Sequence, residues 1–380
     1  MYMEKSQVLQ NTTEKLGKVA LVHDFLLYRG GAERVLRALA DMFPEAPIYT
    51  LLYDRDGMRG MFDDRDVRTS FLGKWPRFLR RRHRWLLPFY GAATEAIDLR
   101  DFDLVISSSG AWSKGIVTRL RTKHVAYIHS PMRFVWDENE RYLRESGGFH
   151  FCKRALLSYL RLWDFEAAAR PDVLIANSRY TAARIEKYYR RPSEIVYPPV
   201  RALVSTDRAA LDICDRPFVT VSRLSKYKQV QSIVRAFAML ELPLVVVGTG
   251  RESEALRRLA PPNVRFLGDV SDGELDTTLR KARAFVFAGE EDFGLALAEA
   301  QRAGLPAIAL ASGGANEIVK EDISGVFFSN ANAESIAAAV RRYIDREASF
   351  DREAIRKSAE QFSEERFREQ VTDIVRNVVE

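Results

Sequence analysis

Several charged residues follow short apolar runs, at places where they could bind a sugar or a phosphate. Arg223 and Lys228 follow the apolar run 218–221, and two cations at the carboxyl end of a strand can converge on one anion. His129 closes the apolar run 124–128, where an imidazole can donate a hydrogen bond to a substrate hydroxyl or to a developing charge. The simpler structural alternatives are a solvated basic loop and a packing role for the histidine.

The segment 290–300 carries two carboxylates eight residues apart. Glu291 falls on an expected loop, and Glu299 falls in an expected helix that begins near Gly294. With a rise of about 1.5 Å per helical residue, the two carboxylates reach points roughly 10 Å apart along an elongated ligand. This span suits a sugar at one end and a ribose at the other. It does not suit a hydrolytic pair, whose members must flank one bond on opposite faces.

Glycines stand at the ends of several apolar runs. The pairs Gly30-Gly31 and Gly313-Gly314 each precede an expected helix, and Gly248 closes another run. Glycine lets backbone N–H groups approach a phosphate closely, and a helix N-terminus adds partial positive charge. A tight strand-to-helix turn explains each glycine equally well. The dinucleotide-binding pattern G-x-G-x-x-G is absent at the first pair, which argues against hydride transfer.

The elements that must position these residues form a repeated βα pattern, in which short β-branched apolar runs alternate with longer amphipathic segments. This pattern is typical of a parallel sheet covered on both faces. The runs lie at 18–23, 48–52, 104–107, 124–128 and 173–177, and again at 218–222, 244–248, 264–267, 284–287 and 307–310. Between the two sets, Tyr197-Pro198-Pro199-Val200 breaks regular structure.

The chain of 380 residues is too long for one ordinary core, and we expect an α/β protein with two doubly wound Rossmann-like domains. The expected parts are a frayed tail at 1–16, a first domain at 17–199, a second domain at 200–362 and a final helix at 363–380. Open α/β sheets bind ligands at the carboxyl ends of their strands, so we expect the function in a cleft between the two domains.

The composition indicates a folded protein with one local basic segment. The chain has 47% hydrophobic and 29% charged residues and a formal net charge of +6. Seven basic residues and no acidic one lie at 67–94, which leaves the rest of the chain at −1. A local patch argues against a protein that coats nucleic acid generally. Two cysteines without paired spacing exclude a disulfide framework, and no apolar run is long enough to span a bilayer.

The basic segment interleaves arginines with aromatic residues. Its members are Trp75, Arg77, Arg80, Arg81, Arg82, Arg84 and Trp85. Such a mixture suits the interface of an anionic membrane, where each basic residue contributes about 1 kcal/mol. A solvated arm that packs on its own domain and a nucleic-acid backbone are the alternatives. From these residues we expect a cytoplasmic protein, unless it lies on a membrane surface.

Taken together, these motifs resemble those of a known enzyme family. Glu291 and Glu299 form an E-x7-E element, and with Glu291-Asp292-Phe293-Gly294 the chain resembles the family 4 retaining glycosyltransferases of the GT-B fold. The resemblance extends to both glycine pairs, to His129 before Pro131, and to Arg223 with Lys228, and it covers nearly the whole chain. The strings Val22-His23-Asp24 and His129-Ser130-Pro131-Met132-Arg133 resemble the bacterial O-antigen and exopolysaccharide mannosyltransferase branch.

The resemblance implies transfer of a hexose, with mannose from GDP-mannose favoured, to a lipid-linked oligosaccharide in O-antigen, capsule or exopolysaccharide synthesis. It favours the membrane alternative for the basic segment, and so a cytoplasmic protein that is peripheral on the inner face of the cytoplasmic membrane. It implies catalytic roles for His129, Arg223, Lys228 and Glu291. It implies donor-binding roles for Gly30, Gly31, Ser222, Arg223, Lys228, Gly248, Phe293, Gly294, Leu295, Glu299, Gly313 and Gly314. The family often has glycine where this chain has Ser222. The final helix is implied to return to the first domain.

No metal or other cofactor is expected, because the nucleotide sugar is a substrate and cationic side chains stabilise the leaving group. Asp101-Phe102-Asp103 has the D-x-D form of metal-dependent glycosyltransferases, but it precedes an expected strand instead of ending one. The alternatives are the same fold with a UDP-sugar donor, a nucleotide-sugar epimerase, and a catalytically silent protein that binds a nucleotide sugar or a membrane. Nucleic acid is not an expected partner.

Overall fold

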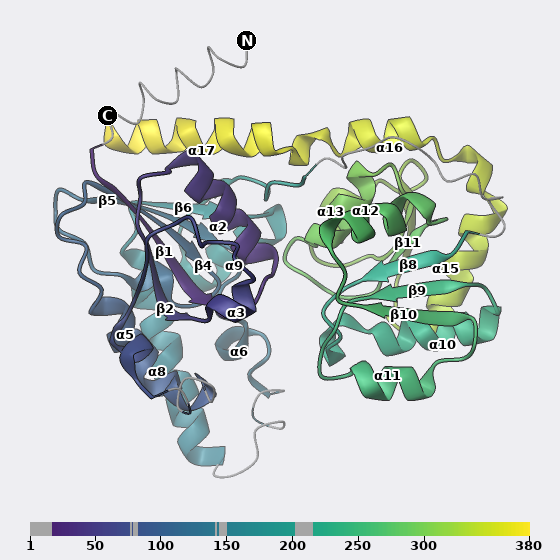
Figure 1. The fold of residues 1–380 in the computed structure, drawn as a ribbon, viewed down its shortest axis with the longest axis horizontal. Coiled ribbons are helices and arrows are strands. Elements are labelled where there is room, and N and C mark those ends of the chain that lie inside the picture. The colour runs from purple at the N-terminus through teal and green to yellow at the C-terminus, as the bar shows by residue number, and fades with distance from the viewer. Residues whose placement is uncertain (1–16, 77, 79–82, 141–142, 144–149, 202–215) are drawn as a thin grey trace. The chain divides into compact units, whose positions relative to one another are not determined.

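A computed structural model of the chain describes residues 17–76, 78, 83–140, 143, 150–201 and 216–380 (Figure 1). The chain divides into two compact units. One unit comprises Met1–Pro199 with Glu365–Glu380, and the other comprises Val200–Glu364. Each unit is built on a parallel β-sheet with helical connections, so the expected α/β class with two doubly wound domains is confirmed. Among the described residues, no helix is both long enough and apolar enough to cross a membrane.

The described sheet of the first unit has the order β3-β2-β1-β4-β5-β6-β7, and all its pairings are parallel. Its strands are β1 (Val19–Leu26), β2 (Ile48–Tyr53), β3 (Val67–Thr69), β4 (Leu104–Ser109), β5 (Lys123–Ile128), β6 (Val173–Ala176) and β7 (Glu194–Ile195). The order reverses between β1 and β4, and such a switch point is where open α/β sheets bind ligands.

The first unit's helices cover this sheet and connect its strands. They are α2 (Gly31–Met42), α3 (Arg55–Met58), α5 (Tyr90–Glu95), α6 (Arg133–Trp136), α8 (His150–Ala169), α9 (Arg179–Tyr189) and α17 (Glu364–Val379), with 3-10 turns η1 (Phe71–Lys74), η2 (His83–Phe89) and η3 (Ser113–Gly115). The apolar runs of β1, β4 and β5 are buried because helices lie on both faces. The core of the unit therefore follows from the same runs that predict the strands.

The last helix, α17, belongs to the first unit although it follows the second unit in sequence. Phe367, Val371 and Val375 recur every four residues, so they lie on one face, and all three are buried with the core of the first unit. The ring of Phe367 lies 5.8 Å from that of Tyr127 on β5. The return of the final helix, which the resemblance implies, is thus present in the fold.

The described sheet of the second unit has the order β10-β9-β8-β11-β12-β13, again with parallel pairings. Its strands are β8 (Phe218–Val221), β9 (Leu244–Val247), β10 (Val264–Gly268), β11 (Phe285–Phe287), β12 (Ala307–Leu310) and β13 (Gly325–Phe328). Its helices are α10 (Val230–Leu240), α11 (Ser253–Leu259), α12 (Asp272–Lys281), α13 (Leu295–Arg302), α14 (Ala315–Ile318), α15 (Ala333–Asp345) and α16 (Arg352–Ser358). The turns η5 (Lys226–Lys228), η6 (Glu347–Ser349) and η7 (Glu360–Phe362) complete the unit.

Candidate active site

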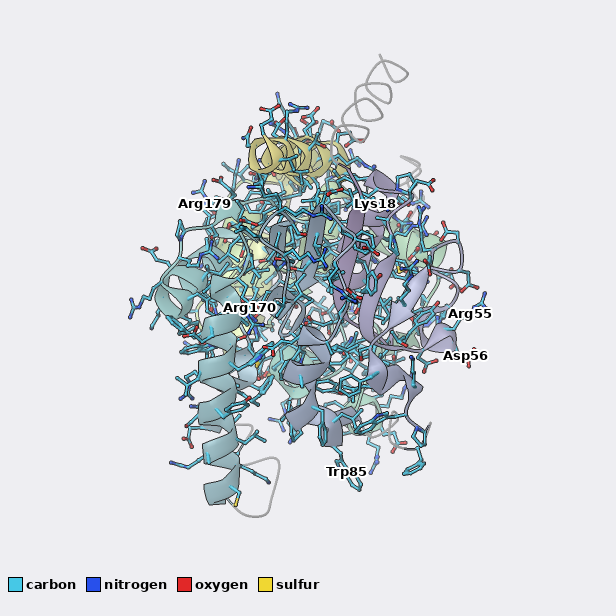
Figure 2. The ribbon with its side chains drawn as sticks, turned by 90° about the vertical axis from the view of Figure 1, so that its left-hand side faces the viewer. Lys18, Arg55, Asp56, Trp85, Arg170 and Arg179 are labelled. Atoms are coloured by element: carbon cyan, nitrogen blue, oxygen red, sulfur yellow. The ribbon has the colours of Figure 1, made fainter. Side chains whose placement is uncertain are left out.

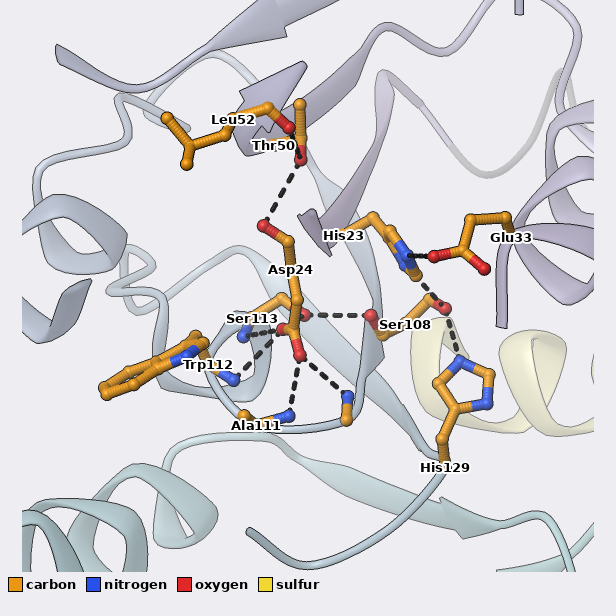
Figure 3. Close-up of polar contacts among 11 residues, drawn as sticks. His23, Asp24, Glu33, Thr50, Leu52, Ser108, Ala111, Trp112, Ser113 and His129 are labelled. Carbon is orange, nitrogen blue, oxygen red and sulfur yellow. Dashed lines mark hydrogen bonds and ion pairs between the residues drawn. The ribbon is translucent and has the colours of Figure 1, made fainter. Parts of the chain in front are cut away.

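In the first unit, polar side chains from three neighbouring strands meet in the carboxyl-terminal part of the sheet. His23 lies on β1, Ser108 lies on β4, and His129 directly follows β5. The hydroxyl of Ser108 lies 3.0 Å from Nδ1 of His23 and 2.7 Å from Nε2 of His129 (Figure 3). Strand order explains this meeting, because β1, β4 and β5 are adjacent and His23 pairs in register with Ser108.

His129 is held by its backbone as well as by its ring. The backbone N–H of His129 donates to the carbonyl oxygen of Ser109 at 2.8 Å, and the side-chain amide of Asn177 donates to the carbonyl oxygen of His129 at 2.9 Å. Burial, reinforced by the nearby His23, lowers the pKa of the His129 imidazole to about 3, and Asp24 opposes the shift. At neutral pH the imidazole is therefore uncharged.

Asp24, next to His23, organises the loop that follows β4. Its carboxylate accepts the backbone N–H groups of four consecutive residues, Gly110 to Ser113, at 2.9, 2.6, 3.0 and 2.6 Å (Figure 3). The Ser113 hydroxyl donates to the same carboxylate. The sequence identifies Asp24 only as part of the string Val22-His23-Asp24, which resembles a family motif. Its position directly after a histidine in a buried strand is the only local signal of its role.

A buried charge pair lies beneath the same loop. Lys114, on η3, is paired with Asp164, on α8, and both side chains are almost completely buried. Trp136 Nε1 and the Tyr189 hydroxyl each donate to Asp164 at 2.8 Å. Breaking a buried pair costs more than forming it gains, so this network ties η3, α6, α8 and α9 together. Sequence reasoning missed it, because nothing in a single sequence connects residues fifty positions apart.

The first glycine pair stands where α2 begins. Gly30 is the N-cap residue and has extended backbone angles, and the exposed Gly31 is the first residue of the helix. Glu33 is buried in the first turn, with its Oε1 3.7 Å from Nε2 of His23. The helix therefore brings a carboxylate to His23 on β1.

In the second unit, Lys228 and Glu291 form an ion pair. Lys228 lies on η5 after β8, and Glu291 lies in the loop after β11, which is the neighbouring strand. The side chains are only 11% and 22% exposed, respectively. Arg223 is exposed in the loop between β8 and η5. Two sequence-predicted residues, 63 positions apart in the chain, are thus brought into contact at the carboxyl edge of the sheet.

The glycines of the second unit have packing reasons of their own. A Cβ on Gly313 would lie 2.3 Å from the carbonyl oxygen of Glu291, and one on Gly314 would lie 2.2 Å from that of Phe293. The N–H of Gly314 donates to the Glu291 carbonyl at 2.9 Å. Gly313 also has a φ of +59°, which favours glycine. These glycines let the segment after β12 lie directly on the segment that carries Glu291.

The other predicted donor-binding residues surround the same edge of the sheet. Gly294 has a φ of +99° and caps α13, whose first residue is Leu295. Phe293 is buried, and Glu299 is half-buried in the second turn of α13. The hydroxyl of Ser222 is buried without a hydrogen-bond partner among the described residues.

Gly248 closes β9 beside Ser222. It has a φ of +125°, and a Cβ there would lie 1.9 Å from the Ser222 carbonyl oxygen. Backbone packing is therefore sufficient to require glycine at this position. At Gly313 and Gly314 a Cβ would likewise lie too close to a backbone carbonyl oxygen.

The aromatic and basic segment is only partly described. Arg77, Arg80, Arg81 and Arg82 lie outside the described residues, as does the side chain of Arg84. Trp75 packs on its own unit, with its ring 6.4 Å from that of Phe71 and 5.5 Å from that of Phe89. Trp85, in contrast, is 64% exposed and projects from the end of the unit (Figure 2).

Acidic and histidine residues are not arranged as a metal site in the described part of the chain. No group of three or more His, Cys, Asp or Glu side chains there could hold an ion. Asp103 precedes β4, and its carboxylate accepts the backbone N–H of Lys18 at 2.9 Å. The D-x-D string thus lies at the start of the strand, away from the carboxyl ends where the candidate residues gather.

Comparison with known proteins gives two family matches that adjoin along the chain. The Glycosyltransferase Family 4 model matches residues 29–202, and the model of Glycosyl transferases group 1 matches residues 208–363. The first match contains His129, and the second contains Arg223, Lys228, Glu291 and Glu299. Together they span most of the chain.

Two relatives and one solved structure illustrate the similarity. A D-inositol 3-phosphate glycosyltransferase of Nocardioides sp. is 31% identical over 54% of this chain and 53% of its own length. A GDP-mannose-dependent alpha-(1-6)-phosphatidylinositol monomannoside mannosyltransferase of Mycobacterium tuberculosis is 31% identical over 46% of this chain and 54% of its own. The matches thus span about half the length of each relative.

The crystal structure of HepE from Anabaena in complex with UDP and glucose covers 94% of this chain and 99% of its own, with a TM-score of 0.69 and 18% identity. That likeness concerns the fold. The two family models adjoin and cover both units, and the chain shares its fold with HepE. It also has two parallel sheets and a last helix that returns to the first unit. The chain belongs to the family 4 glycosyltransferases and has the GT-B fold.

Proposed function

We propose that the chain is a retaining glycosyltransferase that moves a hexose from a nucleotide sugar to a lipid-linked glycan, with GDP-mannose as the favoured donor. The observation that carries the proposal is the ion pair of Lys228 with Glu291 at the carboxyl edge of the second sheet. A cation there can take a diphosphate, and a carboxylate beside it can accept hydrogen bonds from sugar hydroxyls. The names of the mannosyltransferase relatives support GDP-mannose.

In the proposed reaction, the bond between the anomeric carbon and the diphosphate oxygen breaks through an oxocarbenium-like state. Negative charge grows on the departing diphosphate, and Lys228 and Arg223 stabilise it electrostatically. The acceptor hydroxyl forms the new glycosidic bond with retained configuration and gives its proton to the departing diphosphate oxygen. Because side-chain cations compensate the leaving group, the proposal involves no metal.

Other residues of the same edge bind the donor in this proposal. Glu299 holds the ribose hydroxyls, and the backbone N–H groups at Phe293, Gly294 and Leu295 lie beside the hexose. For Gly31, at the N-terminus of α2, we propose a role in binding the diphosphate, because a helix N-terminus presents free N–H groups and partial positive charge. His129 contacts the hexose.

The ion pair gives the sharpest test. Glu291→Gln keeps the shape of the side chain and removes its charge, and Lys228→Met keeps the length of the stem. Each change should lower kcat for mannose transfer from GDP-mannose at least roughly a hundredfold. Glu353→Gln, at an exposed glutamate of α16, is the matched control. Near wild-type transfer by Glu291→Gln would reject this assignment of the site.

The same assay separates the alternative functions. The UDP bound in HepE makes a UDP-sugar the chief rival donor, so GDP-mannose and UDP-glucose are compared with and without a lipid-linked acceptor. Faster turnover of UDP-glucose would replace the favoured donor. Conversion of the donor without acceptor would identify an epimerase. Thermal stabilisation by a donor without any turnover would identify a silent binding protein.

We also propose that the lipid-linked acceptor is reached at the cytoplasmic face of an anionic membrane, through the aromatic and basic segment of the first unit. Trp85 and Phe78 are 64% and 65% exposed in this segment, and seven basic residues at 67–94 surround them in sequence. Exposed aromatic rings enter the interface, while arginines attract anionic lipid.

Vesicle co-sedimentation tests this surface. Binding should require anionic lipid, weaken with salt, and fall severalfold in Trp85→Ser. Met239→Ser, at a residue of α10 that is 52% exposed, is the control in the second unit. Binding to neutral and anionic vesicles alike, or none at low salt, would rule out the membrane proposal. Preferential binding of duplex RNA or DNA would assign the segment to nucleic acid instead.

A further inference from the structure

The contacts of His129 continue as a chain of polar groups back to α2. Ser108 Oγ lies between the two histidines, at 2.7 Å from Nε2 of His129 and 3.0 Å from Nδ1 of His23. Nε2 of His23 then faces Oε1 of Glu33 at 3.7 Å (Figure 3). His23 and Glu33 are both buried, so the electrostatic attraction between a ring N–H and the carboxylate is little screened by bulk solvent.

The direction of the protons along this chain follows from what each group can donate. A carboxylate accepts only, so when His23 carries a single ring proton, that proton is placed on Nε2, the nitrogen nearer Glu33. Nδ1 of His23 is then an acceptor, and the single hydroxyl proton of Ser108 is donated to it. The oxygen of Ser108 is left to accept from His129, so Nε2 of His129 carries the proton.

The opposite direction is disfavoured by Glu33. If Ser108 donated to His129, it would accept from Nδ1–H of His23, and a neutral His23 would then face Glu33 with an unprotonated Nε2. Two acceptors would confront each other in a buried site, which is costly. The buried carboxylate at the start of α2 therefore determines which nitrogen of a histidine two strands away carries the proton.

We propose that Glu33, His23 and Ser108 are positioning residues that hold His129 as its Nε2–H tautomer, so that Nδ1 accepts a hydrogen bond from a hexose hydroxyl. The identity of this ligand rests on the proposed function. Among the described residues, no side chain or backbone group donates to Nδ1 of His129. The sequence alone suggests that His129 donates to the substrate. The proton arrangement gives it the acceptor role instead, which orients the sugar and supplies no acid.

The tautomer can be measured directly by long-range proton–nitrogen NMR of the full chain labelled with ¹⁵N-histidine. The signals of His129 are assigned by their loss in His129→Gln. Wild type should show the Nε2–H pattern at His129. Ser108→Ala and Glu33→Gln should each raise the Nδ1–H population of His129. Ser108→Ala removes the hydroxyl that links His23 to His129, and the glutamine amide in Glu33→Gln can donate to His23 as well as accept from it. Glu45→Gln, at an exposed glutamate beyond the other end of α2, should leave the pattern unchanged.

Two results would overturn the relay: an Nδ1–H tautomer at His129 in wild type, or the same tautomer in wild type, Ser108→Ala and Glu33→Gln. His124 serves as an internal reference, because it bonds to Ser107 and lies outside the relay. This readout does not depend on catalysis. A chain that shows the expected tautomers but transfers no hexose would retain the relay and lose the proposed function.

Kinetics of hexose transfer provide the second readout. Glu33→Gln should lower kcat/KM roughly tenfold, the size of one well-formed hydrogen bond. The Glu45→Gln control should transfer at the wild-type rate. If Glu33→Gln shifts the tautomer without changing kcat/KM, the hydroxyl contact at Nδ1 is refuted, and the relay has only a structural role.

Discussion

Asp24 shows how a single carboxylate can set the shape of a loop at the candidate site. Its two oxygens accept four backbone N–H groups and one hydroxyl from residues 110–113. The donors of Trp112 and Ser113 would otherwise be buried without partners, because both residues are buried. The loop leads into η3 and so determines where Lys114 enters the buried network with Asp164.

We therefore predict that Asp24→Asn lowers the free energy of unfolding by about 2–4 kcal/mol, because an amide replaces a charged acceptor with a group that is half donor. Urea denaturation of the two proteins measures the difference. Asp56→Asn, at an exposed aspartate of α3 (Figure 2), should leave the midpoint nearly unchanged. Equal midpoints for wild type and Asp24→Asn would show that the loop does not need the carboxylate.

The sequence could identify Asp24 as a member of a motif, but not as the acceptor of this loop. The Lys228–Glu291 pair is different, because both residues follow apolar runs, and strand ends can be found from hydrophobic pattern alone. The hydrophobic pattern does not indicate that β8 and β11 are neighbouring strands. The contact depends on β8 and β11 pairing directly, with β12 beyond them.

At the level of elements, most strands were predictable from their apolar runs, but β3, β7 and the largely buried edge strand β13 were not. The runs at 48–52 and 307–310 correspond closely to β2 (Ile48–Tyr53) and β12 (Ala307–Leu310). β3 and β7 were not predicted, because they are edge strands of three and two residues. Each contains an exposed charged residue. An edge strand of this kind needs no continuous apolar run, so hydrophobic pattern does not reveal it.

The helix α17 makes an element-scale prediction possible, because one chain segment completes the core of a unit far from it in sequence. Val371 is fully buried there. Val371→Ala should lower the free energy of unfolding by about 2 kcal/mol, through lost burial and the cavity left behind. Gln370→Ala, at the exposed neighbouring position, is the control in urea denaturation. Equal stability of the two variants would mean that α17 does not contribute to the core.

At the scale of the whole molecule, the net charge of +6 is the sum of a nearly neutral body and one basic segment. The cations proposed to bind the donor are balanced locally, as in the pair of Lys228 with Glu291. The total charge therefore carries little information on donor binding. The net charge instead reflects the basic segment proposed to bind the membrane. Donor binding and membrane binding therefore need separate experiments.

Buried histidines should make the stability of the chain depend on pH. His124 is completely buried on β5, with Nε2 2.8 Å from the Ser107 hydroxyl. Burial, and to a lesser extent Arg191 and Arg170, lowers the pKa of His124 to about 3. The pKa of an unfolded histidine is about 6.5. Below that value the unfolded chain binds a proton that the folded chain does not bind, so acid favours unfolding.

The free energy of unfolding should consequently be constant above about pH 7 and fall as the pH drops from about 6.5 toward 3. His124 alone should cost about 2 kcal/mol at pH 5, because each unit below 6.5 is worth roughly 1.4 kcal/mol. His129, whose pKa is also lowered to about 3, lowers the free energy of unfolding further in the same pH range.

Urea denaturation between about pH 5 and pH 8 measures the slope of the free energy of unfolding with pH. In His124→Gln the slope should be roughly half that of wild type, because one of these two titrating groups is gone. A wild-type stability that stays level down to about pH 5 would contradict the lowered pKa values of His124 and His129.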